Sequence, residues 1–206
     1  MHAPLDRILA SLPVHVLLIA SVVIVSLLGF ASDSVKRALI LNPSRVRKNG
    51  EVHRLLTAGW LHGDGSHLVF NMISLYFFAY ETARALGTLR FLLLYFTAVV
   101  VAFIPTMLRY MNRSNYSSLG ASGAVAAVMF SAILLYPKLR MTLMFLPIPV
   151  PGIVFALAYL AYSAWHSYTS GDDINHDAHF SGAIYGALLT YALEPARVTR
   201  TLNSFF

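Results

Sequence analysis

The sequence of 206 residues contains no cysteine and few charged residues. Without cysteine, the chain can form no disulfide framework, and no thiolate can act as a nucleophile or a metal ligand. Charged residues are 12% of the sequence, whereas about a quarter is usual in soluble domains. Hydrophobic residues make up 57%. This composition predicts a membrane protein.

The formal net charge is +6, but the basic residues lie between apolar runs and form no basic domain. This distribution favours contact with anionic lipid headgroups over binding of nucleic acid. The sequence has no internal repeat, no low-complexity tract and no sign of a second domain. We therefore expect a single membrane domain over residues 1–206.

Apolar runs of roughly the length that crosses a bilayer, about 20 residues, predict six membrane spans. The third run, "FLLLYFTAVVVAFIPTML", is the clearest, whereas the second and sixth contain polar residues that usually face a bundle interior. The first run could also be a secretory signal, but its length and poor cleavage chemistry favour a retained span. The expected spans are residues 14–30, 67–86, 91–108, 121–136, 147–168 and 178–193. They predict an all-α polytopic membrane protein, a bundle of six transmembrane helices.

Six spans place both termini on one side of the membrane, and basic residues near span ends mark the cytoplasmic side. On the side where both termini lie, the terminal segments and the short connections contain Arg7, Arg84, Arg90, Lys138, Arg140, Arg197 and Arg200. The long connection 31–66 carries six basic residues on the other side and argues against this orientation. We expect cytoplasmic termini and a location in the plasma (inner) membrane.

A polar stripe follows one face of the second expected span. Its members, at offsets of four, seven and fourteen residues, are His67, Asn71, Ser74 and Glu81. At about 3.6 residues per turn, these offsets return to one helix face. Hydrogen bonding between helices explains Ser74 and Glu81. His67 and Asn71 lie together at the outer end of the span, and we interpret them as a functional pair.

Small residues predict close contact between the fourth and sixth spans, because they let helix backbones approach in lipid. The small faces consist of Ser122, Gly123, Ala126 and Ala127 in the fourth span, and Ala178, Gly182 and Gly186 in the sixth. His179 lies on nearly the same face as Gly182 and Gly186. Since both spans begin at the same membrane surface, we expect Ser122 and His179 at similar depth and within reach of each other.

A serine beside a histidine can perform acyl transfer, because serine is a weak nucleophile that needs an adjacent base. The imidazole of His179 suits that role near neutral pH. Gly120 and Gly123 remove side chains around the Ser122 hydroxyl, so a substrate backbone can approach. The N-terminus of the fourth helix offers N–H groups to an oxyanion, and the functional pair of the second span could add donors. The motif differs from the elbow G-x-S-x-G of soluble hydrolases.

Three motifs occur in order on the second, fourth and sixth spans: "HGDGSHLVFN", "GASG" and "AHFSGAIYG". Together they resemble the rhomboid family of intramembrane serine proteases, over about residues 51–193. The resemblance implies that Ser122 and His179 form a catalytic dyad. It also implies that His67 and Asn71 stabilise the oxyanion.

The same resemblance implies structural roles for Glu81, in "ETARALG", and for His62. It implies substrates that are transmembrane proteins with locally unstable helices, since a stable helix hides its carbonyls in hydrogen bonds. We expect no metal and no organic cofactor, and the lipid bilayer as the surroundings. No nucleic acid partner is expected.

The sequence departs from the family pattern at two places. The first loop often has Trp-Arg where this chain has His53-Arg54. The residue four after the serine is often an aromatic that stacks on the catalytic histidine, and here it is Ala126. Another residue must then orient His179, and the candidates are Tyr162, Trp165 and Tyr185. No carboxylate is evident as a third member of the site beside the serine and the histidine. Asp177 is a weak candidate.

Three other interpretations stay open. A metal site could be formed by His62, His67, His176 and His179 with Asp64 and Asp177, since His and carboxylate suit zinc. However, HExxH is absent, and such a site leaves the serine between glycines unexplained. A non-catalytic relative could bind membrane helices without cutting them, which the alanine at 126 would permit. A transporter is the weakest alternative, suggested by the prolines 147, 149 and 151 and opposed by the absence of an inverted repeat.

Overall fold

The computed structural model of the chain describes residues 13–143, 146–169 and 175–204. Within these residues the fold is mostly helical and has one small sheet. The long helices are α2 (Val14–Ala31), α6 (Gly65–Leu86), α7 (Thr88–Tyr110), α8 (Ser122–Leu135), α9 (Gly152–Thr169) and α10 (His176–Leu193). The shorter ones are α3 (Asp33–Leu39), α4 (Pro43–Asn49), α5 (Arg54–Thr57), the 3₁₀ turn η1 (Ala58–Trp60) and α11 (Pro195–Asn203).

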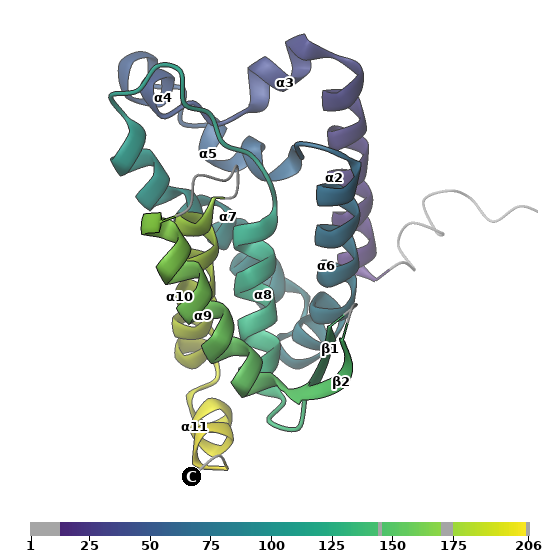
Figure 1. Cartoon of the computed structure of the whole chain (residues 1–206). Helices are drawn as coiled ribbons and strands as arrows, with labels where there is room; N and C mark the ends of the chain where they lie inside the picture. The colour runs from purple at the N-terminus through teal and green to yellow at the C-terminus, as the bar shows by residue number, and fades with distance from the viewer. Residues whose placement is uncertain (1–12, 144–145, 170–174, 205–206) are drawn as a thin grey trace, which may run out of the picture.

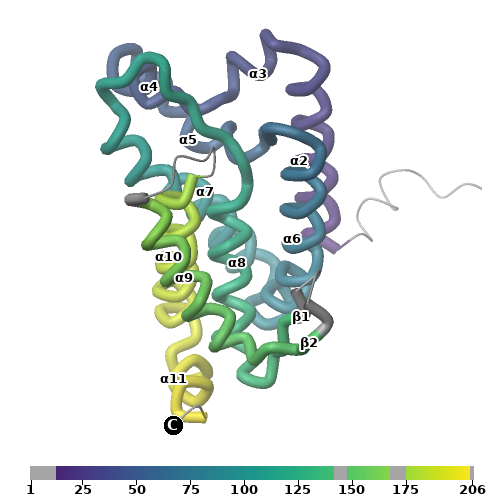
Figure 2. Tube along the Cα trace, in the orientation of Figure 1, coloured from purple at the N-terminus to yellow at the C-terminus, as the bar shows by residue number. Residues whose placement is uncertain are grey.

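Helix α8 lies in the middle of the bundle (Figures 1 and 2). Every residue from Gly123 to Ile133 is buried, and the helix packs against α6, α7 and α10. Helix α2 packs on α6 at the edge of the bundle. A helix that is apolar on all faces can be surrounded by other helices in this way. The arrangement places the N-terminus of α8, and therefore Ser122, among the ends of its neighbours.

The fifth predicted span begins later than expected. The strands β1 (Arg140–Leu143) and β2 (Leu146–Pro151) form an antiparallel hairpin, and α9 starts only at Gly152. Proline has no N–H group and fixes its φ angle, so the alternating prolines of "LPIPVP" cannot sit inside a helix. The predicted start at residue 147 is therefore wrong, and the all-α class is corrected to a mostly helical fold with a small hairpin.

Two helices of the described chain, α2 and α7, are long and apolar enough to cross a membrane. Helix α8 is apolar but shorter, and its 14 residues span about 21 Å at 1.5 Å per residue. The other long helices, α6, α9 and α10, do not meet the criterion of length and hydropathy. Composition therefore supports a membrane protein, but by itself it does not show six spans.

The long connection between α2 and α6 forms a folded cap over one end of the bundle. Helices α3, α4 and α5 lie at this end, and α11 and the hairpin lie at the other (Figure 1). Arg54 is 3% exposed, and its Nη1 donates to the carbonyl oxygens of Arg37 and Ile40 at 2.8 Å each. An antiparallel bridge joins Leu41 to Ser118 in the α7–α8 loop. The buried arginine thus organises the loop in which the sequence departs from the family pattern.

Candidate active site

A cavity of about 1020 Å³ lies where the N-terminal ends of α6, α8 and α10 meet. The four side chains that the sequence analysis assigned to chemistry, Ser122, His179, His67 and Asn71, all line it. They come from three helices that are far apart along the chain. The fold therefore brings the three motifs to one place.

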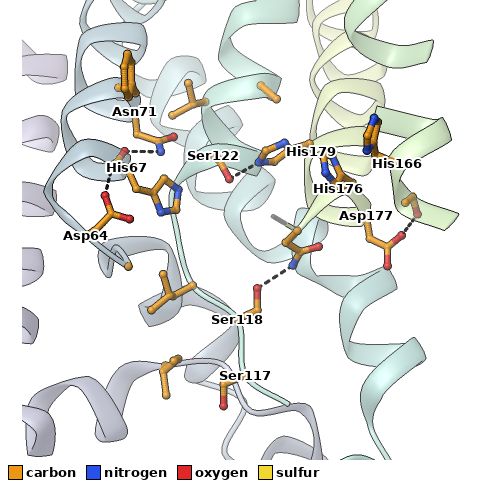
Figure 3. A pocket seen from close by; sticks show the side chains of 18 of the residues that line it. Asp64, His67, Asn71, Ser117, Ser118, Ser122, His166, His176, Asp177 and His179 are labelled. Carbon is orange, nitrogen blue, oxygen red and sulfur yellow. Dashed lines mark hydrogen bonds between the residues drawn. The ribbon is translucent and has the colours of Figure 1, made fainter. Parts of the chain in front are cut away.

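Ser122 and His179 are in direct hydrogen-bond contact. The distance from His179 Nε2 to Ser122 Oγ is 2.7 Å, and Figure 3 shows the two side chains pointing toward each other. Both are partly exposed in the cavity. Ser122 is the first residue of α8, where helix N–H groups have no partner inside the helix and the dipole is positive. A hydroxyl, an imidazole in hydrogen-bond contact with it and a helix end that can stabilise an anion thus coincide.

The contact depends on a close approach of α8 and α10. A Cβ atom added to Gly182 would lie 2.1 Å from the carbonyl oxygen of Gly123. A Cβ atom added to Gly186 would lie 2.3 Å from the carbonyl oxygen of Ala127. The backbones therefore touch along the small faces of the two helices, and no side chain fits between them.

The loop before α8 is shaped around His67. Gly120 has a φ angle of +120°, which disfavours residues with a side chain. A Cβ atom on Gly120 would lie 2.9 Å from Cε1 of His67 and 3.8 Å from Oγ of Ser122. The missing side chain thus lets the imidazole of His67 approach the serine-bearing loop.

His67 and Asn71 are held at the start of α6, beside the serine (Figure 3). The carboxylate of Asp64 caps this helix by accepting the backbone N–H of His67 at 2.8 Å. The amide of Asn71 donates to the carbonyl oxygen of His67 at 2.9 Å, within its own helix. The same amide nitrogen carries a second N–H that can serve an oxyanion in the cavity. Ser74 of the same stripe also lines the cavity.

The ring of His179 has an aromatic neighbour that the sequence analysis missed. Tyr159 on α9 lies nearly parallel to it, with ring centroids 6.2 Å apart and an interplanar angle of 24°. Of the residues considered from sequence, Tyr185 instead donates its hydroxyl to Thr97 at 2.7 Å. Tyr162 lies against His166 at 4.2 Å with the rings tilted by 36°, and Trp165 is 69% exposed. None of these three has a stacking contact with His179 among those described, and Tyr159 becomes the stronger candidate for orienting its ring.

Asn175 is a second residue that was missed. Its side-chain oxygen caps α10 by accepting the N–H of Ala178 at 3.0 Å, and also accepts the hydroxyl of Thr106 at 3.0 Å. Its amide donates to Ser118 Oγ at 2.8 Å. The side chain therefore joins α7, the α7–α8 loop and the start of α10. An asparagine immediately before the first residue of a helix is a recognisable N-cap signal.

The acidic side chains of the metal interpretation are engaged elsewhere. The carboxylate of Asp177 receives Arg109 Nη1 at 3.1 Å and the hydroxyl of Ser167, while Asp64 caps α6. No group of three His, Asp or Glu side chains within the described part of the chain could hold a metal ion. Neither carboxylate is thus available to support a histidine metal site.

His62 is buried beneath the site, outside the long helices. Its Nδ1 lies 2.9 Å from Ser26 Oγ, which donates its only proton to the carbonyl oxygen of Trp60. His62 must therefore donate from Nδ1. Its ring meets that of His67 edge to face at 4.9 Å. Burial, followed by the charge of His67, lowers the pKa of His62 to about 4.

Comparison with known proteins shows which family this chain resembles. The family model described as the Rhomboid domain matches residues 49–196. A mitochondrial RHOMBOID-like protein 12 of Arabidopsis thaliana is 31% identical over 165 residues, which are 73% of this chain and 49% of the relative. YdcA of Bacillus subtilis (strain 168), named as a candidate rhomboid protease, is 33% identical over 143 residues, 69% of this chain and 68% of the relative. The mitochondrial Rhomboid protein 1 of Saccharomyces cerevisiae is 27% identical over 146 residues, 69% of this chain and 42% of the relative.

This chain spans about half the length of the Arabidopsis relative, and about two thirds of that of the Bacillus relative. Relatives named as mitochondrial stand beside a bacterial one, so they do not favour the plasma membrane as its location. The domain match covers all three motifs and most of the long helices. The chain belongs to the rhomboid family of membrane proteins.

Proposed function

We propose that the chain is an intramembrane serine endopeptidase that uses a dyad of Ser122 and His179. The observation that carries this proposal is the 2.7 Å contact between His179 Nε2 and Ser122 Oγ in a cavity at the N-terminus of α8. A serine in hydrogen-bond reach of an imidazole is the geometry that nucleophilic catalysis needs. The adjacent helix end supplies the N–H groups that acyl transfer needs for its oxyanion.

The reaction proceeds by acyl transfer. Ser122 Oγ attacks the carbonyl carbon of the scissile peptide bond, and its proton passes to His179 Nε2. The Ser122 N–H, with His67 and Asn71, stabilises the negative charge on the former carbonyl oxygen. His179 then donates the proton to the leaving amine as the C–N bond breaks, which leaves an ester on Ser122. A water molecule, deprotonated by His179, attacks the ester, releases the acid and restores the serine.

The substrates we propose are transmembrane segments with locally unstable helical structure. A peptide bond in an intact helix has its carbonyl hydrogen-bonded, and its carbon is inaccessible to a nucleophile. Ser122 lies at a helix end beside a large cavity, which admits both water and an unwound segment. The six long helices are the proposed membrane spans.

We also propose that both termini are cytoplasmic. The end of the bundle with α11 and the hairpin carries Arg140, Arg197 and Arg200, as the rule for cytoplasmic basic residues requires. The site lies toward the other end of the bundle, and Arg7 lies outside the described residues. In a bacterial cell, the proposed location is the inner membrane, with both termini in the cytoplasm.

A fluorophosphonate probe tests the dyad, because it reacts with activated serines. Wild-type protein in detergent should be labelled and should cleave a panel of labelled transmembrane segments that contain glycine or proline. Ser122→Ala should lose both activities, with an unchanged melting temperature. Ser117→Ala is the matched control, since Ser117 lines the same cavity in an exposed position and should be labelled as the wild type.

Chelators should leave labelling and cleavage unchanged, and strong inhibition by them would revive the metal interpretation. Cleavage by Ser122→Ala near the wild-type rate would refute the serine mechanism. Wild-type protein that is folded but neither labelled nor active would instead indicate a non-catalytic family member.

A further inference from the structure

Helix α8 offers no aromatic side chain at the position where the family pattern often has one against the catalytic histidine. The position one turn after Ser122 is Ala126, which is 2% exposed and packs in a cluster with Phe130 and Ala183. A methyl group is too small to cover an imidazole face. Whatever holds the ring must therefore come from another helix.

Tyr159 of α9 occupies this place. Its ring lies 6.2 Å from that of His179 at 24°, within the range of about 4.5–7 Å in which aromatic rings stack with an offset. Tyr159 also packs against the cluster that contains Ala126. The space left by the small residue on α8 is thus used by a large residue on α9.

Tyr159 is itself fixed by two aromatic neighbours. Phe155, one turn earlier on α9, lies 6.1 Å away at 28°, and Phe130 of α8 lies 6.0 Å away at 56°. A tyrosine between two such rings has little freedom to rotate, because packed aromatic side chains have few available rotamers. The surface that it offers to His179 is therefore rigid.

We propose that Tyr159 is the positioning residue for His179. The contacts that hold the imidazole include Tyr159 on its face, the edge-on ring of His176 at 5.9 Å, and Ser122 Oγ at Nε2. This inference rests on the proposed dyad, since only a base must keep such a geometry. It makes the alignment of the dyad depend on α9 as well as on α8 and α10.

Stacking also favours the charge that forms during the reaction. When His179 takes the proton of Ser122, its ring becomes a cation. The face of a tyrosine ring carries partial negative charge and attracts a cation within about 6 Å. Tyr159 is at the limit of that range, so we expect the orientation of the ring to dominate over the attraction.

The test measures how fast the fluorophosphonate probe labels Ser122, with the maximal rate kinact and the probe affinity KI determined separately. Tyr159→Ala should lower kinact by about 10- to 100-fold, since a misplacement of 1 Å costs on the order of 100-fold, and should leave KI within about twofold. Tyr159→Phe keeps the ring and should stay within about threefold of wild type. Leu157→Ala, on the same helix and 62% exposed, is the matched control and should be unchanged.

A transplanted ring makes the test independent of simple loss of packing. Adding Ala126→Tyr to Tyr159→Ala moves the aromatic ring to α8 and should recover part of the lost kinact. Melting temperatures of all variants show whether each is folded.

Wild-type labelling together with an unchanged kinact in folded Tyr159→Ala would overturn this inference and leave the dyad intact. Equal losses in Tyr159→Phe and Tyr159→Ala would also overturn it, because the phenyl ring keeps the stacking surface. Absence of labelling in the wild type would overturn the proposed function and, with it, the inference.

Discussion

The histidines of this protein show how the surroundings of a side chain decide its chemistry. His179 and His67 face the cavity, and His179 contacts Ser122, the proposed nucleophile. His62 has the same side chain, but it is 2% exposed and donates from Nδ1 to Ser26. A charged imidazole there would lose its hydration without gaining a carboxylate partner. Burial therefore favours the neutral form and makes His62 a structural residue.

The depressed pKa of His62, about 4, predicts how stability changes with pH. Between this value and the ordinary value of about 6.5, the unfolded chain binds a proton that the folded chain does not. The free energy of unfolding therefore falls as the pH is lowered through this window. His62→Asn cannot be protonated and keeps an amide donor near the position of Nδ1. Its melting temperature in detergent should decline less than that of the wild type between pH 7 and pH 5.

Other titrating groups affect both proteins equally, so the comparison isolates His62. A decline of the same size in wild type and His62→Asn would show that His62 does not contribute to acid sensitivity.

At the scale of elements, the site depends on the distance between α8 and α10. The motif glycines of the two helices lie backbone against backbone, and this close approach is what brings His179 to Ser122. Asn175 adds to it, because the cap at the start of α10 also bonds to α7 and to the α7–α8 loop. Replacing such a cap by alanine typically costs about 1 kcal/mol. The dyad is thus a product of helix packing.

Gly182→Ala should reduce stability and activity together. Its Cβ atom would lie 2.1 Å from a backbone oxygen of α8, so the helices must separate. In a helix, alanine is otherwise about 1 kcal/mol more favourable than glycine, so a loss would have to come from this clash. Gly65→Ala in α6 is the matched control, because nothing lies within 4 Å of its added Cβ. Melting temperature and probe labelling of both variants check this prediction.

We expect Gly65→Ala to match or exceed the wild type in stability. If Gly182→Ala were as stable and as reactive as Gly65→Ala, the two helices would not pack as closely as described.

At the scale of the whole molecule, the two ends of the bundle differ in what they carry. One end has the folded cap of α3, α4 and α5 and lies nearer the site, whereas the other has the hairpin and α11 (Figure 1). The long connection between α2 and α6 is also basic. Within it, Arg45 forms an ion pair with Glu51 at 3.0 Å. The polar cap of this connection is therefore folded on itself, but its basic residues argue against cytoplasmic termini and oppose those of the short loops.

The absence of cysteine allows a direct measurement of orientation, since introduced cysteines react without background. Ser114→Cys lies in the exposed α7–α8 loop, and Ser204→Cys lies after α11. In intact bacterial cells that express the protein, a membrane-impermeant maleimide should label the first and not the second. In permeabilised cells the maleimide should label both cysteines. The reverse pattern would place the termini outside.

Local patterns in the sequence were sufficient for most helices and for the choice of site residues. The predicted second span, 67–86, lies within Gly65–Leu86, because periodicity and apolar composition are properties of one segment. The fifth span was placed five residues too early, since its apolar prolines satisfied a hydropathy criterion while excluding a helix. Ser122, His179, His67 and Asn71 were chosen because they belong to short motifs, and the structure then places all four around one cavity.

The sequence by itself determined that this chain is apolar, mostly helical and built around a serine and a histidine on small-residue helix faces. Only the tertiary structure decided which aromatic ring stacks on His179, and that Asn175 bonds to three segments. The rotation of α9 about its axis selects Tyr159 over Tyr162 and Trp165. That rotation results from the packing of all neighbouring helices at once, and no pattern within one segment records it.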